Sequence, residues 1–327
     1  MATGDQRSAE ATGLPEFILV GAPKCGTTSL HAMLALHPDV FIPEYEVFFF
    51  DVDDIMVHPD FFFHRDGSSF HDYEGEFEEY LAWYRSLFVD AQPGQLIGED
   101  TTTYLCSPYA SSRIAKLLPD VKLIALLRDP VDRAYSQYFH NVRAGRHSVS
   151  FERTLRTNPG ALLMHGFYYE QLERYRGFMD AGQMLVLFFE DFAADPTGLL
   201  RQVCDFLDLQ DLPPASAEAQ HSNRAHPPLN LRARLFVNHW LGHLFSFPRT
   251  RPNLPGYRGP DAPNPQARPL RPHERAILSL DERFPRPPPA PMSATTREVL
   301  QKVFAKRNAG LADLLGCDVS ARWPYMR

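Results

Sequence analysis

A glycine-bounded turn with an internal lysine is the first stretch of the sequence that could do chemistry. In GAPKCGTTS, Gly21 and Gly26 have the spacing of a phosphate-binding loop, but Thr27 stands where a nucleoside-triphosphate loop has its lysine. The lysine of this chain, Lys24, lies inside the turn. Glycines let the backbone approach an oxyanion, and hydroxyls at a helix start donate to it. The turn therefore predicts an anion site of another type.

Buried strands must position this turn. Each predicted strand is a continuous apolar run, and each is followed by a segment with helical periodicity. Strands that alternate with helices form parallel sheets, whose ligands bind at the carboxyl ends of the strands. We expect an α/β fold, a P-loop-type three-layer α/β/α arrangement with a central parallel sheet. The expected strands are 17–21, 121–129 and 183–191, and the helices 27–37, 130–145 and 196–209.

The remaining segments are less regular. Residues 44–88 are rich in aromatic side chains and are expected to form a wall of the active-site cleft. Residues 248–291 hold 13 of the 29 prolines and eight arginines, which predicts a long irregular excursion. The segment 294–316 predicts a terminal amphipathic helix or helix pair. We expect a disordered N-terminus over 1–14 and a single domain over 15–327.

Composition limits the function classes. The chain has 327 residues, a net charge of −7 and 22% charged residues, which argues against binding to nucleic acid or to an acidic membrane. Its four cysteines lie far apart, which fits a reducing compartment. The first 14 residues contain no apolar signal core, and no run approaches 18 apolar residues. We expect a cytoplasmic enzyme without a membrane span.

Several motifs, taken in order, resemble the sulfotransferases that use 3′-phosphoadenosine 5′-phosphosulfate (PAPS). That family has a lysine inside a P-loop-like turn followed by Gly-Thr-Thr/Ser. The motifs look most like those of the glycosaminoglycan (heparan sulfate-type) branch and its bacterial relatives. After the turn they are LHPDV, EYEVFFFD at 44–51, GEDTTTY at 98–104, LLRDPVDRAYSQY at 126–138 and LADLLGCDVSARW near the end.

The resemblance implies a donor site with two phosphate-binding parts. Arg128 and Ser136, eight residues apart, match the family's 3′-phosphate residues, and a guanidinium suits a phosphate dianion. Lys24 would also stabilise the negative charge that develops on the leaving nucleotide, so we expect no metal requirement. The residues expected around the 5′-phosphosulfate are Lys24, Cys25, Gly26, Thr27, Thr28 and Ser29.

The resemblance also implies a catalytic base. Transfer requires removal of a proton from the acceptor, and in this branch a glutamate before an aromatic-Asp run removes it. Glu46 occupies that place and Glu44 is the second candidate. Nearby aromatic rings would desolvate the carboxylate and raise its pKa. A histidine base stays open, with His221 and His226 as candidates.

Two departures from the branch concern the acceptor. Phe48 stands where the branch often has histidine, and Asp100 replaces the lysine of a Glu-Lys-Thr triplet. Acceptor contacts at these positions cannot be carried over, which argues against a sulfated polysaccharide. For the nucleobase, Tyr168 is the candidate, and Arg258 or Arg286 is expected to close over the nucleotide.

Two other functions compete with sulfonate transfer. A P-loop nucleotide kinase or NTPase would depend on Mg²⁺, and a non-catalytic module would keep the nucleotide pocket without turnover. The expected acceptor is a small molecule or carbohydrate, including lipids and secondary metabolites. The aromatic segment favours an apolar acceptor, whereas the arginine-rich segment favours an anionic one. The sequence leaves open O- or N-sulfation and the oligomeric state.

Overall fold

A computed structural model describes residues 13–64, 67–210, 231–241 and 292–327. The chain divides into two compact units. The described residues of the first unit are 13–64, 67–128 and 170–210, and those of the second are 129–169, 231–241 and 292–327. The single domain expected over 15–327 stays a prediction, and the expected disordered N-terminus lies almost wholly outside the described residues.

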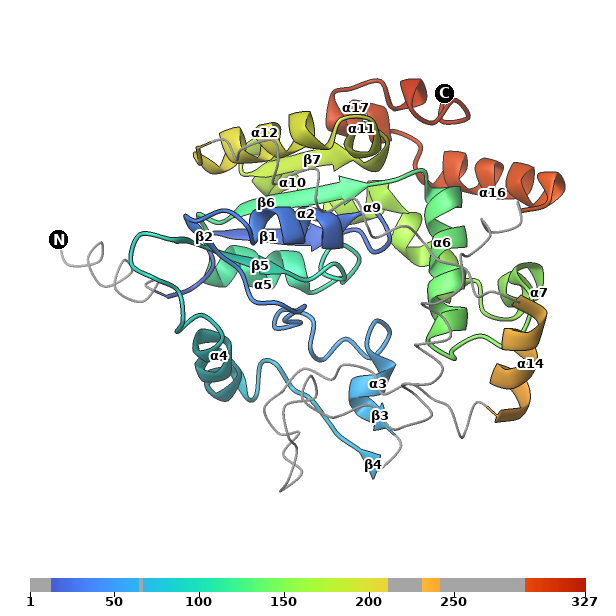
Figure 1. Cartoon of the computed structure of the whole chain (residues 1–327), viewed down its shortest axis with the longest axis horizontal. Coiled ribbons are helices and arrows are strands. Elements are labelled where there is room, and N and C mark those ends of the chain that lie inside the picture. The colour runs from blue at the N-terminus through green and yellow to red at the C-terminus, as the bar shows by residue number, and fades with distance from the viewer. Residues whose placement is uncertain (1–12, 65–66, 211–230, 242–291) are drawn as a thin grey trace. The chain divides into compact units, whose positions relative to one another are not determined.

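The first unit is built on a five-stranded parallel sheet with the order β2-β5-β1-β6-β7 (Figure 1). Its central strand β1 pairs Leu19 with Asp100 of β5 on one side and with Ile124 of β6 on the other. The three strands predicted from apolar runs are confirmed. The strand bounds are β1 Phe17–Gly21, β2 Val40–Phe41, β5 Leu96–Asp100, β6 Lys122–Leu127 and β7 Met184–Phe188.

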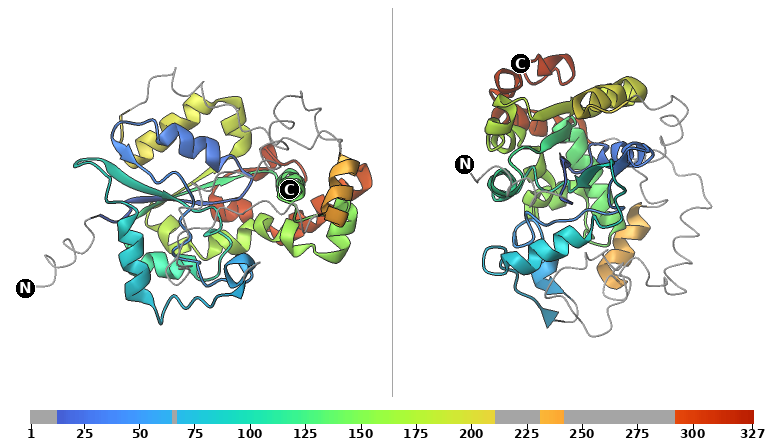
Figure 2. Two further views of the ribbon diagram at one scale, coloured as in Figure 1. Left: turned by 60° about the horizontal axis from the view of Figure 1, so that its bottom comes forward. Right: turned by 90° about the vertical axis from the view of Figure 1, so that its left-hand side faces the viewer.

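Helices cover both faces of this sheet. Helices α2 (Thr27–Leu34) and α12 (Pro196–Leu207) lie on one face, and α5 (Ala110–Leu117) and α10 (Arg176–Asp180) lie on the other (Figure 2). The predicted three-layer α/β/α fold is therefore confirmed. The other elements of the unit are α3 Pro59–Phe62, the antiparallel pair β3 Phe63–His64 and β4 Gly67–Ser68, α4 Phe77–Ser86 and α11 Phe189–Ala194.

A close approach explains one glycine of the sheet. A Cβ atom on Gly98 would lie 2.1 Å from a ring carbon of Phe17, so β5 and β1 can pair in this register only with glycine there. Phe17 itself is fully buried. The pairing brings the carboxyl end of β5 beside the carboxyl end of β1, where polar residues of both strands meet.

The second unit is helical and is organised around α6 (Pro130–Arg143). Asp129 caps this helix by accepting hydrogen bonds from the backbone nitrogens of Val131 and Asp132, at 2.8 and 3.2 Å. The buried face of α6 packs in a core with Phe151, Leu162, Leu300 and Phe304, among others. The other helices are α7 Phe151–Thr157, α8 Gly160–Leu163, η1 Met164–Gly166, α14 Leu231–Leu241, α16 Ala294–Arg307, α17 Leu311–Leu315 and η3 Val319–Ala321.

Two features of the second unit bear on the predictions. Helix α9 (Tyr168–Glu173) begins in this unit and ends in the first. The predicted terminal helix pair is confirmed as α16 and α17.

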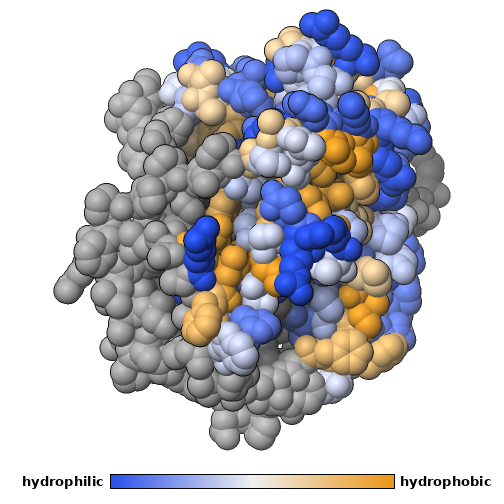
Figure 3. Space-filling view, turned by 90° about the vertical axis from the view of Figure 1, so that its right-hand side faces the viewer, coloured by the Kyte–Doolittle hydropathy of each residue, from blue (hydrophilic) through white to orange (hydrophobic). Residues whose placement is uncertain are grey.

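On the face drawn in Figure 3, hydrophobic residues occur in small groups separated by hydrophilic ones. Within the described ranges, every helix is too short or too polar to cross a lipid bilayer.

Candidate active site

The turn between β1 and α2 has the backbone of an anion-binding loop. Lys24 and Gly26 both have left-handed φ angles, +69° and +97°. The φ angle of Gly26 favours glycine, and a Cβ atom there would make a tight contact of 3.0 Å with the ring of Phe189. The turn thus folds back tightly and presents the start of α2 at the carboxyl end of β1.

The first turn of α2 offers hydrogen-bond donors. Within the described ranges no side chain caps this helix, and its first turn contains no acidic residue. No described residue accepts a hydrogen bond from the backbone nitrogens of Thr27 or Thr28. Thr27 is buried, Ser29 is half-buried and Thr28 is exposed. Backbone N–H groups in this position, together with the helix dipole, favour an anion.

Arg128 lies against the same loop. It follows β6, and its guanidinium donates a hydrogen bond of 3.3 Å to the backbone oxygen of Lys24. The guanidinium also lies 4.5 Å from the centre of the Phe189 ring, the ring that contacts Gly26. The structure therefore brings Arg128 and the lysine turn together, and their assignment to the two phosphates of the donor stays a prediction. Its proposed partner Ser136 is a buried residue of α6 in the second unit.

Glu46 is held at the carboxyl end of β5. Its Oε1 atom accepts two hydrogen bonds from Thr102, one from the backbone nitrogen at 2.9 Å and one from the hydroxyl at 2.5 Å. Burial raises the pKa of Glu46 above its usual range, the charge of Asp100 raises it further, and the Thr102 hydrogen bonds act in the opposite direction. The carboxyl group is thus held in one orientation, and its pKa is raised.

Thr101, the first residue after β5, fixes the backbone of the segment that carries Glu46. The hydroxyl oxygen of Thr101 accepts hydrogen bonds from the backbone nitrogens of Val47 and Phe48, at 3.0 and 3.1 Å. Phe48 adopts a left-handed φ of +61°, which is uncommon for a bulky residue. The same Thr101 hydroxyl donates to Oε1 of Glu99 at 3.0 Å. Glu99 therefore anchors the segment through Thr101.

Glu99 is a buried carboxyl group surrounded by hydroxyls. Its side chain is fully buried and accepts hydrogen bonds from Tyr84, Tyr104 and Thr101. Burial raises the pKa of Glu99 to about 7, although these hydrogen bonds favour the charged form. Through Thr101, the Glu99 carboxyl group supports the backbone of the segment that carries Glu46.

Asp100 places a second carboxylate beside Glu46. It is 6% exposed, its Oδ2 atom lies 3.2 Å from Nδ1 of His31, and no described residue forms a hydrogen bond with its buried Oδ1 atom. His31 belongs to α2, so this pair joins the end of β5 to the helix of the lysine turn. Where the glycosaminoglycan-type branch has a lysine, this site carries negative charge.

The lysine turn and the base-holding segment are in direct contact. A Cβ atom on Gly21 would lie 2.7 Å from the backbone oxygen of Thr102. Gly21 also has a φ of +149°, within the region that favours glycine. Since Gly21 begins the turn that carries Lys24, the anion loop and Glu46 belong to one packed assembly.

The other predicted site residues have varied outcomes. Glu44 is exposed, whereas Glu46 is held by two hydrogen bonds, and the assignment of Glu46 as the base stays a prediction. Cys25 is fully buried, with its sulfur 3.7 Å from the oxygen of Pro23. Tyr168 is fully buried in the second unit, and its ring lies 5.9 Å from that of Trp323. Outside the described residues lie His221, His226, Arg258 and Arg286.

Sequence reasoning missed the residues that hold the base. Thr101, Thr102 and the pair of Asp100 with His31 act through contacts between segments some 55 to 70 residues apart. The available signal was the polar run EDTTT directly after a buried strand position, since polar residues at a strand's carboxyl end often face a ligand.

Comparison with known proteins agrees with the geometry. A model described as the sulfotransferase family matches residues 15–214. The mouse (Mus musculus) heparan sulfate glucosamine 3-O-sulfotransferase 3B1 is 34% identical over 205 residues, which cover 60% of this chain and 47% of that protein. The Bos taurus bifunctional heparan sulfate N-deacetylase/N-sulfotransferase 2 is 28% identical over 212 residues, 60% of this chain and 22% of that protein.

A solved structure extends the likeness over nearly the whole chain. A sulfotransferase from Alicyclobacillus acidocaldarius has a TM-score of 0.59 and 24% identity, and the match covers 96% of this chain and 99% of that one. At this identity the likeness shows the fold alone. The chain spans about half the length of the mouse 3-O-sulfotransferase it matches. The predicted resemblance is confirmed.

Proposed function

Because the chain belongs to the sulfotransferase family, we propose that it transfers a sulfonate group from PAPS to an acceptor hydroxyl by in-line displacement. One observation carries the proposal: a glycine-lysine anion loop, an adjacent arginine and a half-buried, oriented glutamate lie in one unit at the carboxyl ends of β1, β5 and β6. Its relatives include heparan sulfate sulfotransferases, which supports the reaction type.

The donor fits the lysine turn on the chain's own geometry. Glycine is favoured at position 26, and the nitrogens of Thr27 and Thr28 have no described acceptor, so an oxyanion can approach closely. Arg128 contributes a guanidinium directly beside the turn. We assign the 5′-phosphosulfate to Lys24, Cys25, Gly26, Thr27, Thr28 and Ser29, and the 3′-phosphate to Arg128 and Ser136.

Glu46 acts as the base through one particular oxygen. Among the described residues, hydrogen bonds reach only its Oε1 atom, and both come from Thr102. Oε2 is then the atom that takes the proton from the acceptor hydroxyl. The raised pKa of the carboxyl brings its proton affinity closer to that required at neutral pH.

Lys24 completes the chemistry on the donor side. PAPS, when bound, supplies an activated sulfonate group on a phosphate that leaves readily. Lys24 places its cation at this phosphate and stabilises the negative charge that develops there. Arg128, which is assigned to the 3′-phosphate, lies next to the backbone of Lys24, so both cations belong to one donor site. The protein therefore needs no bound metal for this step.

The location and acceptor belong to the proposal as well. We keep the cytoplasm as the predicted location, which is supported by four cysteines that are all free thiols. The acceptor is a carbohydrate, a lipid or a secondary metabolite. The late arginines, Arg258 or Arg286, and Tyr168 stay predictions for binding the nucleotide's outer parts.

Calorimetric titration with 3′-phosphoadenosine 5′-phosphate (PAP), in metal-free buffer, tests the proposal. ADP serves as the matched control because it lacks the 3′-phosphate that Arg128 and Ser136 are assigned to bind. We expect tight binding of PAP and little response to ADP. A preference for ADP or ATP that requires Mg²⁺ would identify a kinase or NTPase instead.

A further inference from the structure

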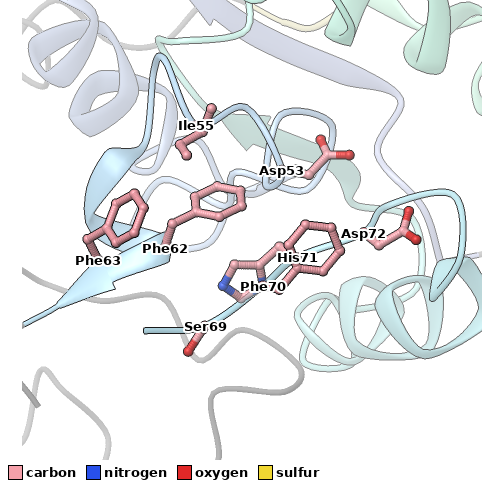
Figure 4. Close-up of a pocket in the computed structure, with 8 residues that line it drawn as sticks. All are labelled: Asp53, Ile55, Phe62, Phe63, Ser69, Phe70, His71 and Asp72. Carbon is pink, nitrogen blue, oxygen red and sulfur yellow. The ribbon is translucent and has the colours of Figure 1, made fainter. Parts of the chain in front are cut away.

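A cavity of about 470 Å³ lies in the aromatic segment of the first unit (Figure 4). Phe62 is buried in its wall, whereas Phe63 and Phe70 are 65% and 80% exposed. In Figure 4 the carboxylates of Asp53 and Asp72 lie on the side away from Phe63. The lining consists of Asp53, Ile55, Phe62, Phe63, Ser69, Phe70, His71 and Asp72.

Exposed apolar side chains gather around this cavity. Of the ten large apolar residues that are exposed in the described part of the chain, four lie between positions 55 and 70. These are Ile55, Met56, Phe63 and Phe70, and three of them line the cavity. Apolar surface concentrated in this way marks a binding site more often than chance exposure. The volume is in the range of small-molecule pockets.

A row of packed rings connects the cavity to the base. Phe48, two residues after Glu46, has its ring 5.6 Å from that of Phe61. The ring of Phe61 lies 6.4 Å from that of His71, a lining residue. The rings of His71 and Phe62 are 5.6 Å apart, and Phe70 follows at 6.4 Å from Phe62. The contacting rings thus run from the wall of the cavity to Phe48, in the segment that carries Glu46.

The charges along this path are negative. Among the residues that the structure describes, the lining contains two aspartates and neither lysine nor arginine. Asp53 is neutralised by Arg113, with two hydrogen bonds of 2.6 and 2.8 Å, but Asp72 is exposed. At the other end Asp100 is buried beside Glu46. An anionic acceptor would be repelled at both ends, whereas an uncharged one would not.

We propose that this cavity binds the apolar body of an uncharged acceptor alcohol, whose hydroxyl group lies at Oε2 of Glu46. This inference rests on the proposed sulfonate transfer and names its acceptor class. In the step itself, the acceptor oxygen forms a bond to sulfur while the bond from sulfur to the phosphate oxygen breaks. The hydroxyl proton passes to Glu46, and the bond electrons leave with the nucleotide.

The test uses 1-octanol as the probe and calorimetry as the readout. The full-length protein, saturated with PAP, is titrated with 1-octanol, with octanoate as an anion of equal chain length, and with glucose as a polar alcohol. We expect binding of 1-octanol and no comparable binding of the other two. Phe70→Ser should weaken 1-octanol binding about tenfold. Val89→Ser, at an exposed apolar residue outside the lining, should leave it unchanged.

Each other outcome contradicts a definite part of the inference. Equal affinity of Phe70→Ser and the parent for 1-octanol would place the alcohol elsewhere. Octanoate binding as tight as that of 1-octanol would remove the requirement for an uncharged acceptor. Self-association that Phe70→Ser abolishes, without 1-octanol binding, would make the surface an interface between copies. Failure of the parent to bind PAP would instead overturn the proposed function, which separates the two.

Discussion

Thr102 donates two hydrogen bonds to a single oxygen atom of Glu46, one from its backbone nitrogen and one from its hydroxyl. Oε1 is thereby held in place, while Oε2, which accepts no hydrogen bond from a described residue, is the atom that we propose takes the proton. The arrangement separates two tasks that one carboxyl group must perform. It also makes the pKa of Glu46 sensitive to small changes at positions 100 and 102, in opposite directions.

Replacement of the base is the most direct prediction. Glu46→Gln keeps the size and one oxygen acceptor but cannot take a proton, so we expect kcat to fall by about 10²–10⁴-fold. PAP affinity should stay as in the parent. Glu44→Gln, at the exposed neighbour, is the matched control and should turn over normally. Normal turnover of Glu46→Gln, measured with labelled PAPS and an accepted alcohol, would transfer the base assignment to a histidine.

Loss of the Thr102 hydroxyl should raise the pKa of Glu46. Its hydrogen bond favours the charged carboxylate, so Thr102→Val raises the pKa of Glu46 further. Because the base must be deprotonated, the acid limb of the kcat profile should shift to higher pH. Thr102→Ser keeps the hydroxyl and should restore the parent profile. A uniform loss of activity without a shift would indicate a structural role only.

Asp100→Asn should have the opposite effect. The charge of Asp100 raises the pKa of Glu46, and an uncharged amide of the same shape removes that contribution. The acid limb should therefore shift to lower pH. A ¹³C NMR titration of the Glu46 carboxyl group measures the same change without any acceptor. An unchanged or higher pKa in this variant would contradict the coupling of the two carboxyls.

The two cations of the donor site should contribute to nucleotide affinity. Lys24→Ala and Arg128→Ala each remove a charged hydrogen-bond donor to phosphate, and we expect PAP affinity to fall by about 10- to 100-fold. Lys116→Ala, at an exposed lysine on α5, controls for the change in net charge. Calorimetry should show the loss for the two loop variants alone. Equal affinities in all three would remove both residues from the donor site.

The buried Glu99 should make stability depend on pH. Its pKa is raised from 4.5 to about 7, so the folded state holds the proton more tightly than the unfolded state. Stability is then fully present below pH 4.5 and declines as pH rises toward 7, by on the order of 3 kcal/mol. Glu99→Gln should flatten this decline in urea unfolding between pH 5 and 7.5. The same slope in parent and variant would contradict the assignment.

The regular part of the fold could be predicted from local pattern. The apolar runs at 17–21, 121–129 and 183–191 are long enough to read as buried strands, and the observed strands lie within them. Strand β5 was missed because its sequence, LIGED, has only two consecutive apolar residues and ends in two acids. Its place beside β1 depends on a glycine against Phe17, which is a tertiary contact.

The parts of the site that consist of consecutive residues could be predicted from the sequence. The lysine turn could be recognised because its residues are consecutive, and the structure gives Lys24 and Gly26 the left-handed backbone that such a turn uses. The support of Glu46 could not, because Thr102 lies 56 positions away in the chain. The pairing of Asp100 with His31 is hidden for the same reason.

The contact between Gly21 and Thr102 has a consequence for how such an enzyme can be altered. A side chain at position 21 would push against the backbone of Thr102, the residue that orients Glu46, so a substitution in this loop would also disturb Glu46. The rings of Phe63 and Phe70, by contrast, are largely exposed. Among the described residues, no ring contact joins them to the glycine turn or to the segment of Glu46. Libraries for new acceptors should therefore vary the 55–72 segment and keep the glycine turn constant.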